Sequence, residues 1–451
     1  MPSSGAGPEL DGAEVSPQAG ASAEYDGFEA LLPLADKERA GAAALGWNHR
    51  RMRRLLGRLG DPHLAMRCTL VAGSKGKGST AVMLAEALVA SGRRTGLYTQ
   101  PHLARYAERV RLGGHPLREL ASERARALLR AVLDAAPGPV TAFEAATAMA
   151  ILAFAEEGAS DAVLEVGFGG RLDATAESEP ALVLLTALER EHVDVLGPTL
   201  AAVASSELAL LRYGRACRSA AQAEEVLRLL WARARAQGAD TALVTPPEPL
   251  GPSRVRLQTP GGHVMEATLG LPGLYQQGNA ALAAAGAEVL GLAPVAIAAG
   301  LAAARWPGRF ERVARRPDVV LDGAHTPGSA RALAAALAAA YPGRRAAVVV
   351  GMLEDKDAAG FAAALGRCAA SVWPVAPRHP RAMATARVAA AWGISAVGGP
   401  PPRHAGSLAA ALDGARAAAG PAGLCVVTGS LHLVAEARAW LGLPPCPPGT
   451  M

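Results

Sequence analysis

The strongest chemical signal in the sequence is a glycine-rich segment that follows a short apolar run. It reads Gly73-Ser74-Lys75-Gly76-Lys77-Gly78-Ser79-Thr80. Phosphate binding needs backbone amides that converge on oxygen atoms, glycine for close approach, and the positive end of a helix. A lysine then reaches the terminal phosphates and a hydroxyl ligates magnesium, and Lys77 and Ser79 suit these roles. We interpret the segment as a nucleotide-phosphate loop that departs from the strict GxxxxGK[ST] pattern; the alternative is a glycine-rich turn without a ligand.

Three further side chains stand where strands are expected to end. Glu165 closes an apolar run directly before a glycine-rich turn, and Asp322 and His325 follow another apolar run. Ligands of doubly wound proteins bind at the carboxyl ends of parallel strands, so these positions favour a site. The alternative for Glu165 is a strand-end carboxylate in solvent. For His192, the residues alone favour a structural histidine over a ligand.

The elements that must position these residues alternate between apolar strands and amphipathic helices. The expected elements are a strand at Arg67–Ala72, a helix at Ser79–Ala90, a helix at Phe143–Glu157, and strands at Ala162–Val166 and Ala181–Ala187. Such alternation predicts an α/β fold with a doubly wound, mostly parallel sheet. Residues 215–271 are less regular, and we interpret them as peripheral strands of the same domain.

The pattern restarts after a Pro-Gly pair at residues 307–308, which predicts a second domain. The expected elements are strands at Val319–Asp322, Ala346–Gly351 and Leu424–Thr428 and helices at Ser329–Ala340 and Ala359–Cys368. We therefore expect a disordered leader at residues 1–23, a nucleotide-binding central domain at 24–305 that carries the phosphate loop, and a smaller C-terminal Rossmann-like α/β domain at 306–451.

Composition excludes several classes of protein. The chain has 451 residues and a net charge of +5, with scattered arginines and only 4% aromatic residues. Nucleic-acid binding, which relies on basic patches and base stacking, is therefore not expected. The five cysteines are far apart and form no CxxC pair, which predicts reduced thiols rather than a metal or disulfide framework. We find no signal-peptide pattern and no membrane-spanning stretch, and expect a cytoplasmic protein.

Ordered motifs from about residue 25 to 440 resemble those of the folylpolyglutamate and dihydrofolate synthases of the Mur ligase family. The loop GSKGKGS is similar to that family's GTNGKGS. Further matches, in chain order, are Tyr98–Leu103 and Tyr106–Arg111 (TSPHL, YxERIR), Leu164–Thr175 (LEVGLGGRLDAT), His192–Gly197 (HxDxLG), Gln276 with Asn279–Ala280 (HQxxNA), Pro307–Glu311 (PGRFE), Leu321–His325 (LDGAH), Asp355–Asp357 (DKD) and Val427–Leu431 (VTGSL).

The resemblance implies a ligase that uses ATP and Mg²⁺ to join a folate or pteroate carboxylate to L-glutamate through an acyl-phosphate. Lys77 would contact the β- and γ-phosphates, and Asn279 would join the loop at residues 73–80 in binding the nucleotide. Arg309 and His325 would come from the second domain to close over the nucleotide. The resemblance also implies a monomer without nucleic-acid or membrane partners.

The same resemblance assigns Asp322 to placing the incoming amino acid and implies two metal positions. Glu165 would hold one Mg²⁺ with Ser79 near it, and His192 would hold a second. Magnesium prefers oxygen ligands and retains water, so few protein ligands are expected.

The segment Ala204–Ala209 departs from the family at a metal position. The family carries a segment like AREKAG there, whose lysine is usually carbamylated and ligates magnesium, and in an ungapped alignment Glu207 falls on that lysine. A glutamate keeps the negative charge but is several atoms shorter. Glu207 is therefore a candidate metal ligand, acting directly or through water, and the alternative is a weakened site.

Other departures also lie at positions near the expected site. They are Lys75 for asparagine, Gln100 for serine, Glu191 for aspartate, Tyr275 for histidine and Thr326 for asparagine. Lys75 adds a positive charge to the phosphate loop, which either strengthens phosphate binding or points into solvent. Asp355 and Lys356 are interpreted as a surface ion pair.

The departures leave two alternatives to a folate ligase. One is a divergent Mur-type amide ligase with a non-folate substrate, and the other is a catalytically impaired paralogue that binds nucleotide or folate without turnover. An impaired paralogue would be expected to lose residues of the site. These residues are nevertheless present: Lys77, Ser79, Glu165, His192, Arg309, Asp322 and His325. The sequence therefore favours an active enzyme.

Overall fold

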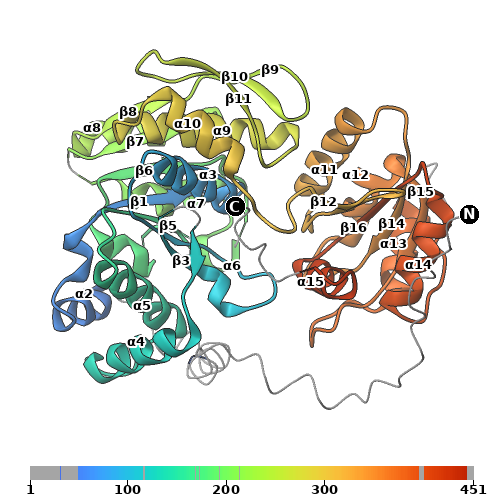
Figure 1. The fold of residues 1–451 in the computed structure, drawn as a ribbon, viewed down its shortest axis with the longest axis horizontal. Coiled ribbons are helices and arrows are strands. Elements are labelled where there is room, and N and C mark those ends of the chain that lie inside the picture. The colour runs from blue at the N-terminus through green and yellow to red at the C-terminus, as the bar shows by residue number, and fades with distance from the viewer. Residues whose placement is uncertain are drawn as a thin grey trace, which may run out of the picture.

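The computed structural model describes residue 31 and residues 49–114, 117–167, 169–171, 173–191, 193–212, 214–395 and 401–443. Within these ranges the chain forms two layered α/β units that stand side by side (Figure 1). The expected leader at residues 1–23 lies outside the described residues.

The larger unit is built on an eight-stranded sheet in the order β4-β3-β2-β5-β1-β6-β7-β8. Its strands are β1 (Arg67–Ala72), β2 (Thr95–Tyr98), β3 (Val110–Gly113), β4 (Arg118–Glu119), β5 (Asp161–Glu165), β6 (Leu182–Leu185), β7 (Ala216–Ser219) and β8 (Asp240–Leu243). The strands from β2 to β8 in this order run parallel, whereas β3 and β4 pair antiparallel at one edge. Strands β5 and β6, on either side of β1, are buried along their whole length, and β1 is buried except at Arg67, as expected for parallel strands covered on both faces.

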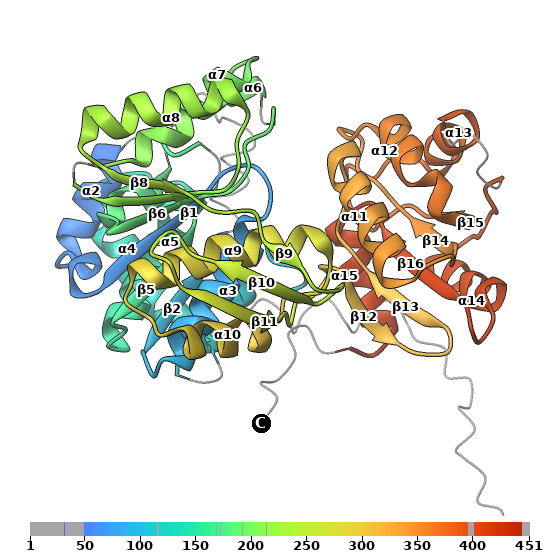
Figure 2. The same ribbon diagram turned by 90° about the horizontal axis from the view of Figure 1, so that it is seen from above.

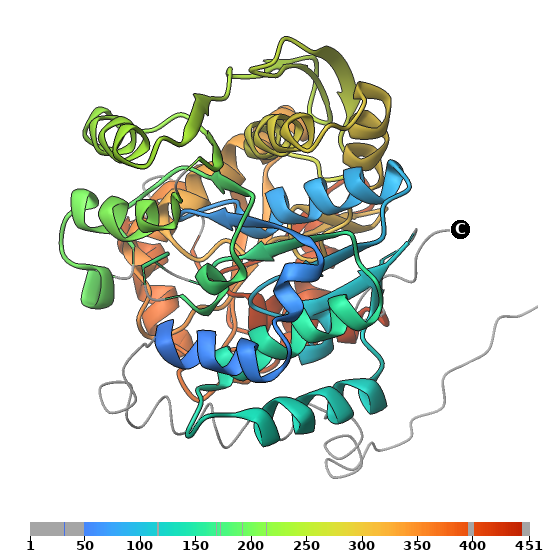
Figure 3. The same cartoon turned by 90° about the vertical axis from the view of Figure 1, so that its left-hand side faces the viewer.

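Helices cover both faces of this sheet, as Figure 3 shows. One face packs against α2 (His49–Arg58), α4 (Ser122–Ala135), α5 (Ala142–Glu156), α7 (Leu200–Glu207) and α8 (Glu224–Gln237). The other packs against α3 (Lys77–Ala90), α9 (Leu274–Val289) and α10 (Pro294–Ala303). Alternate residues of β1 enter the two cores, Leu70 the first and Val71 the second. The short helix α6 (Val193–Leu196) precedes α7.

Residues 215–271 combine sheet-edge strands with a helix that the sequence interpretation overlooks. Strands β7 and β8 extend the parallel sheet, and β9 (Glu248–Pro249), β10 (Arg254–Gln258) and β11 (Val264–Thr268) form a separate antiparallel sheet beside α9 and α10 (Figure 2). The interpretation as strands alone is wrong for α8. Its buried Val226, Leu230 and Ala234 recur every four residues, which is a helical spacing.

The smaller unit has a five-stranded sheet in the order β12-β13-β16-β14-β15. Its strands are β12 (Glu311–Ala314), β13 (Asp318–Leu321), β14 (Ala346–Val350), β15 (Ala369–Pro374) and β16 (Leu424–Thr428). Its helices are α11 (Pro327–Ala340), α12 (Ala358–Leu365), α13 (Thr385–Ser395), α14 (Leu408–Ala419) and α15 (Leu431–Trp440). All strands run parallel except β12, which pairs antiparallel with β13 at the edge.

The predicted fold class is confirmed, with a doubly wound, mostly parallel sheet and a smaller α/β domain. Helix α10 ends at Ala303 and β12 begins at Glu311, so the predicted boundary at residues 305 and 306 falls in the connection between them, and its position stays a prediction. Among the described residues, no helix has the length and apolar character needed to cross a bilayer.

Candidate active site

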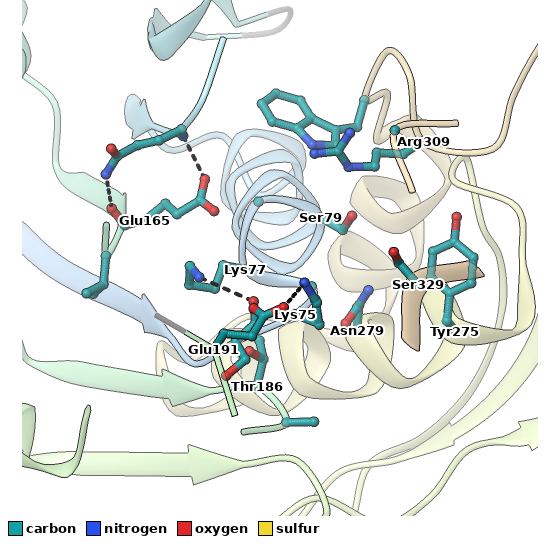
Figure 4. A pocket seen from close by; sticks show the side chains of 18 of the residues that line it. Lys75, Lys77, Ser79, Glu165, Thr186, Glu191, Tyr275, Asn279, Arg309 and Ser329 are labelled. Atoms are coloured by element: carbon teal, nitrogen blue, oxygen red, sulfur yellow. Dashed lines mark hydrogen bonds and ion pairs between the residues drawn. The ribbon is translucent and has the colours of Figure 1, made fainter. Parts of the chain in front are cut away.

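A cavity of about 1240 Å³ lies where the two units meet. The larger unit contributes the phosphate loop, the carboxyl end of β5 and the first turns of α9, and the smaller unit contributes Arg309, the segment Asp322–His325 and Ser329. Figure 4 shows Glu165 and Tyr275 on opposite sides of this cavity, with Lys77 and Ser79 between them. The site therefore draws on the ends of strands from both sheets.

The phosphate loop turns sharply between β1 and α3. Gly73 and Gly76 have φ angles of 117° and 89°, in the left-handed region that glycine adopts without steric cost. A Cβ atom on Gly73 would overlap Thr186, and one on Gly76 would overlap Asn279. The Lys77 Nζ donates to the Gly73 carbonyl at 2.7 Å, so its ammonium folds over the loop. A glycine-rich turn without a ligand, the alternative interpretation, does not explain why the Lys77 ammonium is enclosed by the loop at the start of the long helix α3.

The loop is tied to the segment that follows β6. The backbone N–H of Glu189 donates to Ser74 Oγ at 2.9 Å, and the Ser74 hydroxyl donates to the Glu189 carbonyl at 3.1 Å. The next loop residue, Lys75, forms an ion pair with Glu191. Lys75 therefore lines the cavity with its charge already partnered, and it does not point freely into solvent.

Glu165 is buried, with 5% of its surface exposed, so the reading as a carboxylate in solvent is wrong. Its Oε2 accepts the Gln100 backbone N–H at 2.8 Å, and the Gln100 side chain donates to the Glu165 carbonyl at 3.3 Å. Burial raises the pKa of Glu165, and Lys77 partly offsets that effect. A carboxylate held in this way is suited to a cation that enters the cavity.

Three polar side chains link α9 to the start of α3. Gln276 Nε2 donates to Ser79 Oγ at 3.2 Å, and Asn279 Nδ2 donates to Gln276 Oε1 at 2.8 Å. Ser79 and Asn279, both predicted to bind nucleotide or metal, thus lie in one hydrogen-bond chain on the cavity wall.

Arg309 and His325 enter the cavity from the smaller unit. The Arg309 guanidinium donates to the Gly308 carbonyl at 3.2 Å. His325 Nδ1 lies 2.8 Å from the Gly323 carbonyl oxygen; since a carbonyl only accepts, Nδ1 carries the proton and Nε2 is left as an acceptor. Burial lowers the pKa of His325 to about 4, so the imidazole is neutral at neutral pH.

Asp322 is 4% exposed, and its carboxylate accepts three hydrogen bonds. Oδ2 accepts the Phe310 N–H at 2.8 Å and the Tyr275 hydroxyl at 3.0 Å, and Oδ1 accepts the Ala324 N–H at 2.8 Å. Burial raises the pKa of Asp322, with Arg309 and these donors acting in the opposite direction. The carboxylate is therefore already engaged with protein groups at the cavity wall.

Glu207 lies behind the cavity and is not among its lining residues. It is 3% exposed, and its Oε1 accepts the Gly169 N–H at 3.1 Å. Within the described residues Oε2 has no hydrogen-bond partner. Burial raises the pKa of Glu207 to about 7, an effect that Lys77 and the backbone N–H groups of Gly169 and Gly73 partly offset. The Gly73 N–H is thus near the carboxyl group, but it makes no hydrogen bond of ordinary geometry to Oε2. A buried oxygen without a donor is a group that a cation or water would satisfy.

The oxygen donors present are compatible with magnesium. A Cβ atom on Gly78 would lie 3.2 Å from Glu165 Oε2, so that carboxylate adjoins the loop residue next to Ser79. In the described part of the chain, no three His, Cys, Asp or Glu side chains form a metal-binding cluster. Magnesium needs few protein ligands, because nucleotide oxygens and water complete its coordination. His192, the other predicted ligand, lies outside the described residues.

Not all predicted residues reach the cavity. Of the loop residues, Ser74 to Ser79 line it, whereas Gly73 and Thr80 do not. Asp355 and Lys356 do not line the cavity and form an ion pair at 2.7 Å, in agreement with their interpretation as a surface ion pair.

One wall of the cavity carries residues to which the sequence analysis assigned no role. Tyr106 and Phe143 line it, together with His102 and Arg109. The Arg109 guanidinium lies 4.3 Å above the Tyr106 ring, and its Nε donates to His102 Nδ1 at 2.9 Å. Tyr106 and Arg109 stand in a quoted motif, which is a signal for them; Phe143 appears only as the first residue of an expected helix.

The chain is similar to known proteins over most of its length. The model of the family "Mur ligase, glutamate ligase domain" matches residues 308–431. The chain is 32% identical over 416 residues to the folylpolyglutamate synthase of Lacticaseibacillus casei, covering 87% of this chain and 94% of that protein. It is 36% identical over 411 residues to a probable bifunctional folylpolyglutamate synthase/dihydropteroate synthase of Haloferax volcanii, of which it spans 47%.

A solved structure of similar fold carries a nucleotide analogue and a metal. It is the bifunctional folylpolyglutamate synthase/dihydrofolate synthase of Yersinia pestis complexed with AMPPNP and a Mn ion. It aligns with a TM-score of 0.77 and 28% identity, covering 91% of this chain and 97% of that one.

Proposed function

The chain belongs to the folylpolyglutamate synthase/dihydrofolate synthase family, and from that premise we propose that it is an ATP-dependent ligase that forms an amide bond between a folate or pteroate carboxylate and L-glutamate. One observation carries the proposal. The phosphate loop of one α/β unit faces Arg309 and His325 of the other across a single cavity. A ligase that must activate a carboxylate and keep water from the product needs this kind of enclosure.

The cavity wall that carries Tyr106 and Phe143 supports the proposal that the acceptor is aromatic. Tyr106 and Phe143 both line the cavity, and aromatic side chains are suited to packing against a flat heterocycle or aminobenzoyl group. Arg109, fixed above Tyr106, supplies a positive charge for the acceptor's carboxylate on the same wall. Because this wall and the phosphate loop line the same cavity, an acceptor bound on the wall would have its carboxylate within the cavity that holds the nucleotide.

The chemistry requires two displacements. An oxygen of the acceptor carboxylate attacks the γ-phosphorus, the bond to the β-phosphate oxygen breaks, and ADP leaves. The amine nitrogen of glutamate then attacks the acyl carbon, phosphate leaves, and the amine loses a proton. Lys77 and Arg309 stabilise charge on the transferred group. His325 presents a neutral Nε2 that can accept a hydrogen bond from the incoming amine.

Magnesium, when bound, neutralises charge on the phosphate oxygens. Ser79 and Glu165 would hold it, with His192 as the family-implied ligand of a second ion. Glu207 contributes a buried carboxyl group behind the loop, and the charge of Lys77 favours its ionised form.

The test incubates purified protein with ATP, Mg²⁺, L-glutamate and either dihydropteroate or tetrahydrofolate. ADP release and product mass are followed together, with Lys77→Ala as the control for contaminating ATPase. A product heavier by one glutamyl residue, matched by ADP, supports the ligase and identifies its acceptor. Gel filtration during the same preparation tests the monomeric state that the family resemblance implies for this enzyme, which we place in the cytoplasm.

Two other outcomes contradict the proposal. Lys77-dependent ADP release without a heavier product favours the divergent ligase with another substrate. Nucleotide binding without ADP release favours the impaired paralogue.

A further inference from the structure

Tyr275 crosses from the larger unit into the smaller one. It is the second residue of α9, yet its ring packs against the hydrophobic core of the smaller unit, which includes Ala336 of α11. Its hydroxyl donates to Asp322 Oδ2 at 3.0 Å. One side chain therefore provides both an apolar and a polar contact between the units.

Asp322, whose carboxylate Tyr275 contacts, also accepts hydrogen bonds from two backbone segments of the smaller unit. Asp322 Oδ2 accepts the Phe310 N–H and Oδ1 accepts the Ala324 N–H. Phe310 has a φ of 47°, a left-handed conformation that costs a non-glycine residue free energy. Arg309 precedes Phe310 and His325 follows Ala324, so Asp322 orders the two backbone turns that present these side chains.

The first turns of α9 also contact the phosphate loop. Gln276, the next residue after Tyr275, donates to the Ser79 hydroxyl, and Asn279 donates to Gln276. The start of α9 is thus a short bridge with the phosphate loop at one end and Asp322 at the other. Figure 4 shows Tyr275 and Asn279 on this helix beside Ser329 of the smaller unit.

We propose that Tyr275 is a positioning residue that couples closure of the two units to the placement of Arg309 and His325. The predicted effect on turnover rests on the proposed ligase function, whereas the predicted effect on closure of the two units does not. The Tyr275 hydroxyl fixes the position of Asp322 relative to α9, and Gln276 fixes the position of α9 relative to the phosphate loop. When the units meet, Arg309 and His325 are thereby aligned with the nucleotide.

The chemistry of the pair suits this role. Burial raises the pKa of Tyr275 well above its usual value, and the neighbouring Asp322 acts in the same direction, so the phenol stays protonated and donates. Phenylalanine would keep the ring and its packing but leave Oδ2 with the Phe310 N–H alone. Histidine, which the family motif carries here, would keep a donor on a different ring.

The test compares wild type, Tyr275→Phe and Tyr275→His in two measurements on the full chain. The first is steady-state kinetics with the acceptor identified above. We expect Tyr275→Phe to lower kcat about tenfold, the equivalent of one hydrogen bond to a charged group. KM for ATP should be nearly unchanged. In Tyr275→His, which keeps a donor, kcat should be partly restored. Tyr341→Phe, a buried tyrosine of the smaller unit that does not line the cavity, is the matched control.

The second measurement is small-angle X-ray scattering with and without AMPPNP and Mg²⁺, which reports closure without turnover. We expect wild type to become more compact on binding and Tyr275→Phe to do so less, with a thermal midpoint lowered by only a few degrees, as the loss of one hydrogen bond predicts. An unchanged kcat with normal compaction overturns the proposal, as does a kcat loss explained by a matching loss of folded protein. If wild type shows no ligase turnover, the ligase function fails, and the scattering comparison alone decides the role of Tyr275.

Discussion

Lys75 and Glu191 form an ion pair within the wall of the cavity. Both residues depart from the family pattern, which carries asparagine and aspartate at these positions, and the structure brings the two departures together. Glu191 lies next to His192 in the chain, and the adjoining Ser74 is hydrogen-bonded to Glu189. The pair therefore ties the phosphate loop to the segment that carries a predicted metal ligand.

If the pair acts as a tether, removing either charge has the same effect. We expect Lys75→Gln and Glu191→Gln each to raise KM for ATP about threefold, in keeping with a partly exposed ion pair of less than about 1 kcal/mol. The double variant is expected to resemble either single one, and steady-state kinetics at varied ATP measures this. A much larger effect of Lys75→Gln would show instead that Lys75 contacts the phosphates.

Glu207 provides a prediction about magnesium. Its Oε1 is engaged by Gly169, whereas its buried Oε2 has no partner in the described part of the structure. Glu207→Gln keeps the shape but removes the carboxyl group that a bound cation would hold in its ionised form, so we expect about a tenfold increase in the Mg²⁺ concentration at half-maximal activity, the effect of losing a residue that supports a metal site. Glu207→Asp should lie closer to wild type.

The control for Glu207 is Glu288→Gln, a carboxylate away from the cavity that also accepts a backbone N–H, from Gly261 at 2.7 Å. Identical magnesium titrations for Glu207→Gln and wild type would remove Glu207 from the metal environment.

Arg309 tests the contribution of the second domain. It is the cavity-lining arginine of the smaller unit, and a preorganised cation at a transferring phosphoryl group contributes strongly to rate. We expect Arg309→Ala to lower kcat/KM about a hundredfold or more, and Arg309→Lys to recover part of the loss because lysine keeps the charge but not the planar fork. The exposed Arg312 on β12 is the matched control for substitution to alanine. Unchanged kcat/KM in Arg309→Ala would exclude an interdomain role.

His102 predicts a pH dependence of stability. Burial, the Arg109 charge and nearby His432 lower the pKa of His102 to about 3, and its Nδ1 must stay unprotonated to accept from Arg109. Because the folded state binds this proton less readily than the unfolded state, stability is retained above about pH 6.5 and lost as the pH falls from there toward 3. At pH 5 the loss amounts to about 2 kcal/mol.

Denaturant unfolding at pH 7.5 and pH 5.0 measures this loss. We expect His102→Gln, which can still accept from Arg109, to lose less stability between the two pH values than wild type. His404→Gln, at an exposed position, is the control. An equal loss in His102→Gln and wild type would assign the acid sensitivity to other groups.

The sequence by itself determined the features that depend on neighbouring residues. The apolar run at Arg67–Ala72, the glycines of the loop and the helical spacing after it predicted β1, the phosphate loop and α3, because conformational demands such as the left-handed φ of Gly73 and Gly76 act within a few residues. Strand ends likewise placed Glu165, Asp322 and His325 at one edge of each parallel sheet.

The tertiary structure alone decided which of these residues act together. Tyr275 and Asp322 are separated by 47 positions in the chain, and Lys75 and Glu191 belong to different loops. No local spacing encodes such contacts, because they depend on how the two units pack and which polar groups that packing buries. For the same reason the sequence left a carboxylate in solvent as an alternative for Glu165 and gave no burial for Glu207, whereas packing buries both carboxyl groups and so raises the pKa of each.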